Sequence, residues 1–188
     1  TCVHDGVGRQ RRGAFGEVQL NDLVQSALPP SAYEFQSTLS TGARVDCLLK
    51  LPNPPGSIGI DAKFPLESYS ALRAVAAGDT AALAIAQRSF QQAMRKHIGD
   101  IRDKYILPGE TAESALMFLP SEAVYAELHA NFTGLVEESY RARVWIVSPT
   151  TMMATLNTVR AVLKDVRMRE QAGEIQKTVG LLLDDVRR

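Results

Sequence analysis

The chain has 188 residues, a length that suits one sizeable hydrophobic core and falls short of two full domains. Its composition, with 45% hydrophobic and 22% charged residues, is that of an ordinary globular protein. The formal net charge of +0 excludes attraction to nucleic acid through overall charge, so any binding of phosphate must come from local clusters of basic side chains.

Simple counts exclude further classes of protein. The 2 cysteines and 3 histidines lie far apart, so they predict neither a disulfide framework nor a zinc site, and they suit a reducing compartment. No apolar run approaches the roughly 20 residues that cross a bilayer. We therefore expect no membrane segment within this chain, and we leave open an anchor outside it.

The first part of the chain predicts a helix followed by three strands. Residues 1–12 are interpreted as a flexible lead-in, and residues 13–28 have apolar side chains at helical spacing before the stop at Pro29-Pro30. Strands are expected at 33–39, 43–51 and 57–64. Short connections rich in glycine and proline separate the strands, which favours an antiparallel meander.

The second part predicts longer helices and two further strands. A helix over 79–105, with its N-cap at residue 79 or 80, has the clearest periodicity in the chain. Its expected apolar seam consists of Leu83, Ala86, Phe90, Ala93, His97 and Ile101. Short apolar strands are expected at 115–119 and 144–147, and the helical stretch between them predicts a right-handed parallel crossover. Other helices are expected at 65–77, from Ser121 onward and over 150–188.

Together these elements predict an α/β domain in which a mixed sheet carries helices on its faces. We place this core at 13–150, between the lead-in at 1–12 and a C-terminal helical extension at 151–188. Trp145 lies in an apolar strand and is expected in the core. The extension alternates charged with apolar positions, which predicts an amphipathic helix that packs on the core or associates with a second copy of the chain.

A candidate site begins in the third strand, at Asp61-Ala62-Lys63. Side chains alternate along a strand, so Ile60 and Ala62 share the core face whereas Asp61 and Lys63 share the other. A carboxylate and an ammonium held side by side suit metal-assisted phosphodiester chemistry. The alternative is an ion pair at the end of a strand, which contributes little to stability.

The second strand carries another acid. Arg44, Asp46 and Lys50 share one of its faces, and the opposite face is apolar and belongs in the core. If the second and third strands pair, Asp46 and Asp61 approach each other. Two carboxylates repel unless a cation joins them, and Mg²⁺ takes oxygen ligands. The sequence therefore predicts a divalent cation held by Asp46, Asp61 and the carbonyl of Ala62.

Glu17 is a third acid, in the first turn of the expected first helix. One interpretation is the favourable interaction of an acid with a helix N-terminus. The other is a place in the site, because Gly13 and Gly16 let a backbone or a phosphate approach that turn closely.

Six segments occur in an order that resembles a known family. They are Arg12-Gly-Ala-Phe-Gly-Glu-Val-Gln-Leu20, Val45-Asp46 before Leu51-Pro52, Ile60-Asp-Ala-Lys-Phe-Pro65, His97-Ile98 leading to Lys104-Tyr105, Leu116-Met-Phe-Leu-Pro-Ser-Glu122, and Val147-Ser-Pro-Thr-Thr151. In these segments the chain resembles the bacterial RmuC family of DNA recombination proteins and, more broadly, the restriction-endonuclease-like PD-(D/E)xK superfamily. Val45 stands where the superfamily motif typically has proline, a change expected to affect strand geometry more than metal chemistry.

The resemblance implies a restriction-endonuclease-like core and a metal-dependent deoxyribonuclease, an endonuclease or exonuclease that acts in recombination or repair and limits DNA rearrangement. Asp46, Asp61 and the carbonyl of Ala62 would hold Mg²⁺ or Mn²⁺, with Glu17 as a further ligand or orienting a water. Lys63 would lie beside the attacking water. Because flanking carboxylates favour its charged form, we expect Lys63 to stabilise charge on the phosphate rather than to act as a base. A cytoplasmic, nucleoid-associated location in a bacterium follows from the same resemblance.

Basic side chains that would contact DNA are expected beside the site and along the long helix. On that helix three arginines recur every 7 residues, which suits a phosphate backbone or, equally, a solvated face, since Asp100 and Asp103 lie nearby. The expected set is Arg44, Lys50, Arg88, Arg95, Arg102 and Lys104. His97 is expected to be buried and hydrogen-bonded, with a phosphate contact as the alternative.

Two other functions stay open. The first is a non-catalytic DNA-binding or scaffold module that retains the nuclease fold. The second is a helical interaction domain whose acids form surface ion pairs only.

Overall fold

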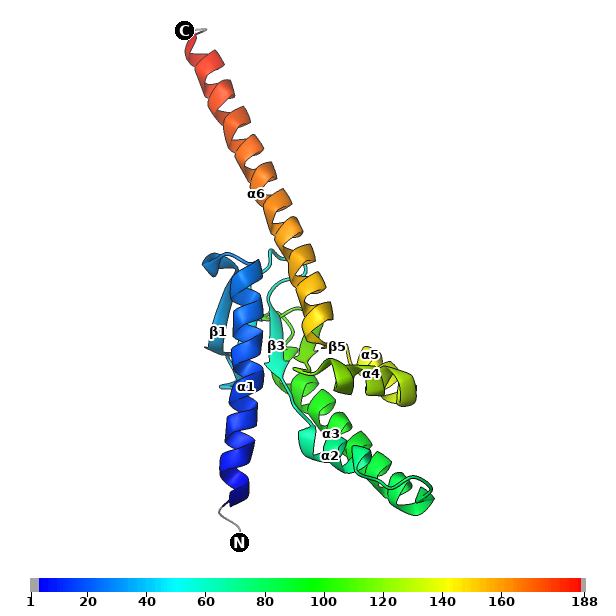
Figure 1. The fold of residues 1–188 in the computed structure, drawn as a ribbon. Coiled ribbons are helices and arrows are strands. Elements are labelled where there is room, and N and C mark those ends of the chain that lie inside the picture. Colours follow the sequence, from blue (N-terminus) through cyan, green and yellow to red (C-terminus); the bar gives the residue numbers. More distant parts are fainter. Residues whose placement is uncertain (1–3, 187–188) are drawn as a thin grey trace.

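The computed structural model describes the backbone of residues 4–186 and the side chains of 15–179 and 181. Figure 1 shows a mixed α/β structure in which helices cover a central sheet. The five strands, in the order in which they lie across the sheet, are β1 (Tyr33–Thr38), β2 (Arg44–Leu49), β3 (Ile58–Ala62), β4 (Ala115–Phe118) and β5 (Val144–Val147). The predicted α/β class and mixed sheet are confirmed.

The sheet changes direction at β3. Strands β1, β2 and β3 pair antiparallel, with Cys47 of β2 opposite both Phe35 and Ile60, so the predicted meander is confirmed. Strands β3, β4 and β5 pair parallel, with Asp61 opposite Met117, which in turn lies opposite Ile146. The parallel crossover is therefore confirmed as well, and the carboxyl ends of the last three strands share one edge of the sheet.

The first helix begins earlier than the sequence pattern indicated, whereas the helix expected at 65–77 ends sooner, at Arg73. They are α1 (His4–Ala27), the short 3-10 helix η1 (Pro30–Ala32), α2 (Leu66–Arg73), α3 (Thr80–Tyr105), α4 (Glu122–Asn131), α5 (Thr133–Arg141) and α6 (Pro149–Val186). Residues 4–12, expected as a lead-in, continue α1 toward the N-terminus, and residues 1–3 lie outside the described part of the chain. Helix α6 runs without a break through Gly173.

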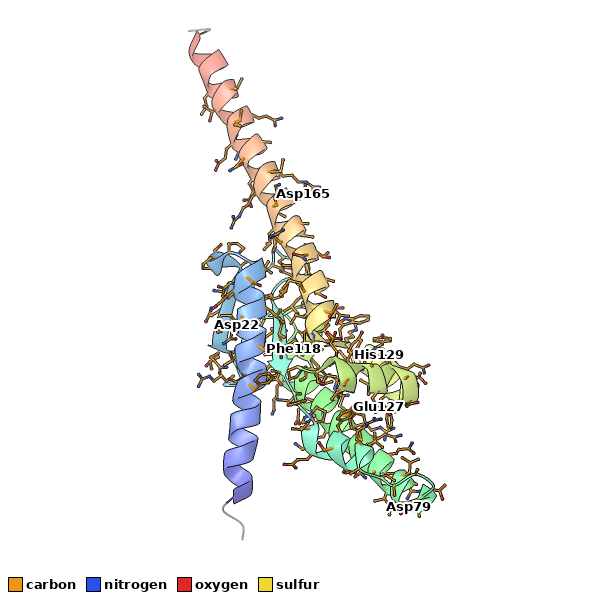
Figure 2. All side chains as sticks on the ribbon, viewed as in Figure 1. Asp22, Asp79, Phe118, Glu127, His129 and Asp165 are labelled. Atoms are coloured by element: carbon orange, nitrogen blue, oxygen red, sulfur yellow. The ribbon has the colours of Figure 1, made fainter. Side chains whose placement is uncertain are left out.

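Each face of the sheet has its own hydrophobic core. On one face α3, α4 and α5 bury Phe90, Ile101 and Met117. On the other face α1 and α6 bury Leu20 and Phe118 with their neighbours. Figure 2 shows Phe118 in the middle of the molecule. The central strands are therefore covered on both faces, which explains why their sequences are almost continuously apolar.

The apolar seam of α3 differs from the predicted one. Its buried side chains are Ala86, Phe90, Met94, Ile98, Ile101 and Tyr105. Leu83, by contrast, is 39% exposed, and the predicted members Ala93 and His97 line a cleft. The prediction was wrong there because the buried side chains of α3 face the core, whereas Ala93 and His97 lie on the neighbouring side of the helix, which lines a cleft. The predicted N-cap is confirmed, since the Asp79 carboxylate accepts a hydrogen bond of 2.9 Å from the Ala82 N–H.

Trp145 does not lie in the core. Its side chain is 46% exposed, and its ring rests on Tyr140 with the ring centroids 5.0 Å apart. Strand β5 is at the edge of the sheet; Val144 and Ile146 enter the core on one face, and Val147 enters the core on the other. The expectation of a buried tryptophan was wrong: Trp145 shares its face of β5 with the buried Val147, but at this position of the edge strand that face is left open.

The start of α6 is tied to α4, and Arg167 still donates to the Ser31 hydroxyl over 3.1 Å, whereas the turns beyond it extend away from the body. The Glu122 carboxylate of α4 accepts a hydrogen bond of 2.7 Å from the Thr150 N–H, so it caps α6. Figure 1 shows α6 continuing well beyond the rest of the molecule, and Asp165 lies on this part (Figure 2). Met168 and Ile175 are exposed there. Within the described residues, no helix is long and apolar enough to span a bilayer.

Helix α1 packs against the end of β3 through Gly16. A Cβ atom at this position would lie 3.2 Å from Cγ of Pro120 and 3.6 Å from Cβ of Ala62. Both neighbours belong to the edge of the sheet where the parallel strands end. The glycine therefore sets how closely α1, and the Glu17 that follows, approaches that edge.

We expect Gly16→Val to destabilise the fold by about 1–3 kcal/mol, because the added methyl groups must push α1 away from Pro120. The matched control is Gly99→Val in α3, where a Cβ meets nothing within 4 Å. Urea unfolding followed by circular dichroism measures both variants. Equal stabilities of the two would contradict this account of the α1 contact.

Candidate functional site

A cleft of about 660 Å³ lies where β3 ends, and it contains most of the predicted site. We call it the site cleft. Its lining residues come from α1, β2, the β3–α2 connection, α2 and α3: Glu17, Asp46, Ala62, Lys63, Phe64, Pro65, Leu66, Glu67, Ser68, Ala71, Ser89, Ala93 and His97. The carboxyl ends of parallel strands are the usual place for ligands in open α/β sheets.

Asp61 is a buried charge held by two partners. Its side chain is only 3% exposed, although its own strand is otherwise apolar. The Tyr105 hydroxyl donates to Oδ1 of Asp61 over 2.9 Å, and the Lys63 ammonium forms an ion pair with Oδ2. Lys63 also lines the site cleft, so the ion pair connects the buried carboxylate with the cleft. The predicted pairing of Asp61 and Lys63 on one face of β3 is thus what the structure shows.

Gly59 makes room for the tyrosine. It lies two residues before Asp61 on the same face of β3, and a Cβ there would be 3.1 Å from Cβ of Tyr105 and 3.4 Å from Val45. Any larger residue would move the ring that carries the donor hydroxyl. Burial and the Asp61 carboxylate raise the pKa of Tyr105, so the hydroxyl keeps its proton and remains a donor.

Asp46 joins β2 to β3 at the cleft. Its Oδ2 accepts a hydrogen bond of 2.8 Å from the backbone N–H of Ala62. Burial raises the pKa of Asp46 to about 6, and the carboxylates of Asp61 and Glu17 add to this rise. The effect of the Asp61 carboxylate on the pKa of Asp46 indicates that the two predicted acids lie close together, as expected from the pairing of β2 with β3.

Glu17 belongs to the same group of acids. Because α1 begins at His4, Glu17 is not in a first helical turn, and the interpretation as a helix N-terminal acid is wrong. Its carboxylate instead lines the site cleft. The Gln36 amide nitrogen lies 3.2 Å from Oε2 of Glu17 and 3.5 Å from Oδ1 of Asp46, so it donates between the two acids.

Gln36 was not predicted from the sequence, and its backbone explains its position. Its φ of 53° lies in the left-handed region, unusual for a residue with a side chain. It stands between the register pairs Phe35–Cys47 and Ser37–Val45, opposite Asp46. Alternation along β2 is broken at the same point, because Val45 packs on the α3 side and Cys47 on the α1 side. The expectation of one continuous apolar face was wrong for this reason.

The predicted basic stripe on α3 faces away from the site cleft. Nε and Nη2 of Arg95 donate to the Glu138 carboxylate of α5 over 2.8 and 2.9 Å, and Arg102 pairs with Asp103. The cleft wall is the other side of the helix, where Ala93 and His97 lie. Spacing of 7 residues therefore did produce a stripe, and it lies on the flank of α3 that faces away from the site cleft.

The remaining basic residues that were predicted to contact DNA lie at several places on the surface. Lys50 forms an ion pair of 2.8 Å with Glu34 at the surface, and Arg44 is exposed at the start of β2. Arg88 is exposed on α3. Lys104 follows His97 by 7 residues, so helical geometry places it on the side of α3 that forms the cleft wall.

His97 lies in the cleft wall as a partly buried ring. Its Nδ1 is buried and, among the described residues, has no hydrogen-bond partner. Burial, followed by the ammonium groups of Lys63 and Lys96, lowers the pKa of His97, so the ring is neutral at physiological pH. Burial was expected for His97, whereas the expected hydrogen bond was not found at Nδ1.

The donor set suits a hard divalent cation. Three carboxylates and a carbonyl are oxygen ligands of the kind Mg²⁺ takes, and a cation would offset the repulsion that raises the pKa of Asp46. As the side chains stand, no three His, Cys, Asp or Glu groups within the described part of the chain converge on one point. Lys63, Gln36 and Tyr105 occupy the carboxylate oxygens instead.

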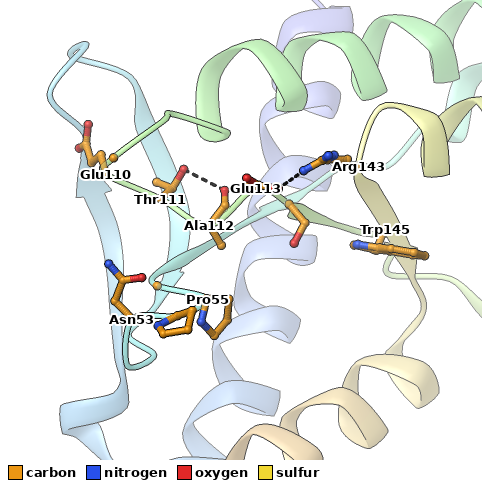
Figure 3. Close-up of a pocket in the computed structure, with 12 residues that line it drawn as sticks. Asn53, Pro55, Glu110, Thr111, Ala112, Glu113, Arg143 and Trp145 are labelled. Atoms are coloured by element: carbon orange, nitrogen blue, oxygen red, sulfur yellow. Dashed lines mark hydrogen bonds and ion pairs between the residues drawn. The ribbon is translucent and has the colours of Figure 1, made fainter.

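A second cavity, also of about 660 Å³, lies at the opposite end of the parallel strands (Figure 3). It is bounded by the loops that precede β3 and β4 and by Arg143 and Trp145. In it Arg143 forms an ion pair with Glu113, and the Thr111 hydroxyl lies 3.3 Å from the carbonyl oxygen of Ala112. It contains none of the predicted site residues, so the candidate chemistry stays with the site cleft.

The fold and the cleft define an α/β protein with a carboxylate-lined site at the ends of its central strands. The model of the RmuC family matches residues 8–188, and the chain belongs to that family. It is 30% identical over 179 residues to a DNA recombination protein RmuC homolog of Xylella fastidiosa, an alignment that covers 90% of this chain and 39% of the relative.

Other relatives agree. Identity is 27% over 186 residues to the Pseudomonas aeruginosa homolog, covering 94% of this chain and 40% of the relative. Identity to the DNA recombination protein RmuC of Escherichia coli is 26% over 185 residues, covering 94% and 38%. The chain thus spans about two fifths of the length of these relatives. No solved structure gives a significant match.

We expect Asp46→Asn to stabilise the folded protein above neutral pH. The pKa of Asp46 is raised from 3.8 to about 6, so the folded state holds this proton more tightly than the unfolded state. Stability is therefore lost as the pH rises from about 4 to 6, and the asparagine removes that loss. Allowing for solvent screening of a partly exposed group, we expect the free energy of unfolding to increase by about 1 kcal/mol.

Urea unfolding at about pH 7.5 and pH 4.5 measures the effect, which should shrink at the lower pH. The control is Asp22→Asn, at an exposed position of α1, which should show no such pH dependence. A gain of equal size at both pH values would contradict the assigned cause.

Proposed function

We propose that this chain carries a metal-dependent site for hydrolysis of DNA phosphodiester bonds, on a restriction-endonuclease-like core. The observation that carries the proposal is that Glu17, Asp46 and Lys63 line one cleft, with Lys63 paired to the buried Asp61. Clustered carboxylates next to a lysine, at the carboxyl ends of central strands, match the needs of phosphoryl chemistry.

The choice of DNA as substrate is supported by the relatives. Proteins of several bacteria that are named DNA recombination protein RmuC, or its homolog, align with 90% or more of this chain. We infer a role in DNA recombination or repair for this chain, inside a bacterial cell, as the resemblance implied. Because the chain covers only part of those relatives, this role is proposed for the site and not for a whole protein.

The side chains take distinct roles in the proposed reaction. Asp46 and Asp61, with the Ala62 carbonyl and Glu17, would hold Mg²⁺ or Mn²⁺. Such a cation lowers the pKa of a bound water and stabilises charge on a phosphate. Lys63, whose ammonium lines the cleft, donates to a phosphate oxygen and stabilises the negative charge that grows there. Tyr105 and Asp61 keep Lys63 directed to that place.

Self-association through the C-terminal helix remains part of the proposal. Ile175, Val179 and Leu181 are exposed on the portion of α6 that leaves the body of the molecule. Isolated helices are only marginally stable in water, so a packing partner for these turns is favoured.

A non-catalytic DNA-binding module is the second candidate. It is favoured by one observation: Tyr105 and Lys63 already contact the Asp61 carboxylate, and the Ala62 N–H already donates to Asp46. A site whose acids serve the fold in this way would bind DNA without cutting it.

We expect Asp61→Asn and Lys63→Met each to lower the rate of Mn²⁺-dependent cleavage of labelled DNA at least about 100-fold. Single-stranded, duplex and branched DNA are tested with and without the metal. The matched controls are Asp165→Asn and Lys177→Met, at exposed positions of the distant part of α6.

Three outcomes separate the candidates. Cleavage by the wild type but not by the two site variants supports the proposal. Cleavage that persists in both site variants discards this site. Tight binding without cleavage in either metal favours the non-catalytic module.

Substitution on α3 tests which flank meets DNA. We expect Lys104→Ala to weaken DNA binding several-fold at low salt and to lower its salt dependence by about one ion. Arg95→Ala, on the flank occupied by Glu138, should leave binding unchanged. Fluorescence anisotropy across a salt series measures both; the reverse order would place DNA on the other side of the helix.

A further inference from the structure

The hydroxyl of Tyr105 touches both strands that carry the acids of the site. It lies 2.9 Å from Oδ1 of Asp61 on β3 and 3.0 Å from the carbonyl oxygen of Arg44 on β2. A phenol has one proton, so it is shared between these two acceptors. Arg44 lies two residues before Asp46 in β2. One hydroxyl therefore fixes a carboxylate directly and the strand of a second carboxylate through its backbone.

The ring itself is held on all sides. Tyr105 is 5% exposed and is the last buried residue of α3. Its ring fills the space left by the missing side chain of Gly59, next to Val45. The Thr111 hydroxyl donates over 2.9 Å to the Tyr105 carbonyl, which fixes the end of the helix. A donor with so little freedom determines the orientation of its acceptor rather than following it.

The orientation matters because the two oxygens of Asp61 then have different roles. Oδ1 is taken by the tyrosine, whereas Oδ2 points to Lys63 and, besides that ion pair, has no hydrogen-bond partner among the described residues. A carboxylate free to rotate would exchange the two oxygens. With Oδ1 fixed, Oδ2 is the oxygen directed to Lys63, and a cation would bind it only in place of that ammonium.

We propose that Tyr105 is a positioning residue of the site cleft: its hydroxyl holds Asp61 and the β2 strand that carries Asp46, two of the acids that would bind a divalent cation. The inference rests on the proposed function and adds a residue to it. Tyr105 touches neither DNA nor the cation, and acts only through the two acids.

The test is Tyr105→Phe, which removes one oxygen and keeps the ring. We expect the dissociation constant for Mn²⁺, followed by loss of the free-ion EPR signal, to rise about 10- to 100-fold, as for other groups that orient metal ligands. DNA affinity should not change. Excess Mn²⁺ should restore most of the cleavage rate, which a general loss of structure would not permit. The matched control is Tyr125→Phe, whose ring stacks on His129 away from the cleft, and it should behave like the wild type.

A second variant covers the case in which Tyr105→Phe fails to fold. Gly59→Ala keeps the phenol and pushes its ring, because the new Cβ lies 3.1 Å from Cβ of Tyr105. It should weaken Mn²⁺ binding in the same direction.

The outcomes distinguish this inference from the proposed function. Wild-type Mn²⁺ affinity and wild-type cleavage in Tyr105→Phe would overturn the role of Tyr105 and leave the proposed function standing. A wild-type protein that neither binds Mn²⁺ nor cleaves DNA would overturn both. Equal losses of Mn²⁺ and DNA binding, without rescue by excess metal, would show a general structural role and overturn the inference.

Discussion

The burial of the Asp61 carboxylate is the constraint on which the rest of the structure depends. A charge removed from water is costly unless it is paired and hydrogen-bonded. The protein meets this requirement with the Lys63 ammonium on one oxygen and the Tyr105 hydroxyl on the other. The end of α3, the glycine at position 59 and the direction of Lys63 all follow from these two contacts.

Acids from distant parts of the chain come together at the end of the sheet where β3 ends. Strand pairing brings Asp46 beside Asp61, and the close packing of Gly16 on Pro120 brings Glu17 to the same cleft. Burial, and then the neighbouring carboxylates of Asp61 and Glu17, raise the pKa of Asp46 to about 6. Natural proteins keep such repulsion mainly where function needs it, and a bound cation is the simplest way to relieve it.

Membership of the RmuC family and the geometry of the cleft rest on separate observations. The family match covers residues 8–188 and rests on sequence alone. The cleft rests on side-chain contacts, two of which involve residues without any predicted role, Gln36 and Tyr105. Tyr105 lay within a segment that resembled the family, so a signal for it existed. Gln36 gave none, because a left-handed backbone in a strand has no sequence signature for a glutamine.

The sequence by itself determined the elements and the central motif. Period-two alternation placed Asp61 and Lys63 on one face of β3, and glycine- and proline-rich connections indicated the meander, because both are local properties of the chain. Only the tertiary structure decided which flank of a helix meets the cleft. Arg95 contacts the Glu138 carboxylate and His97 lines the site cleft. Trp145 is exposed on the edge strand β5. Helical spacing fixes which residues share a face, whereas the neighbours that cover that face come from packing between distant segments.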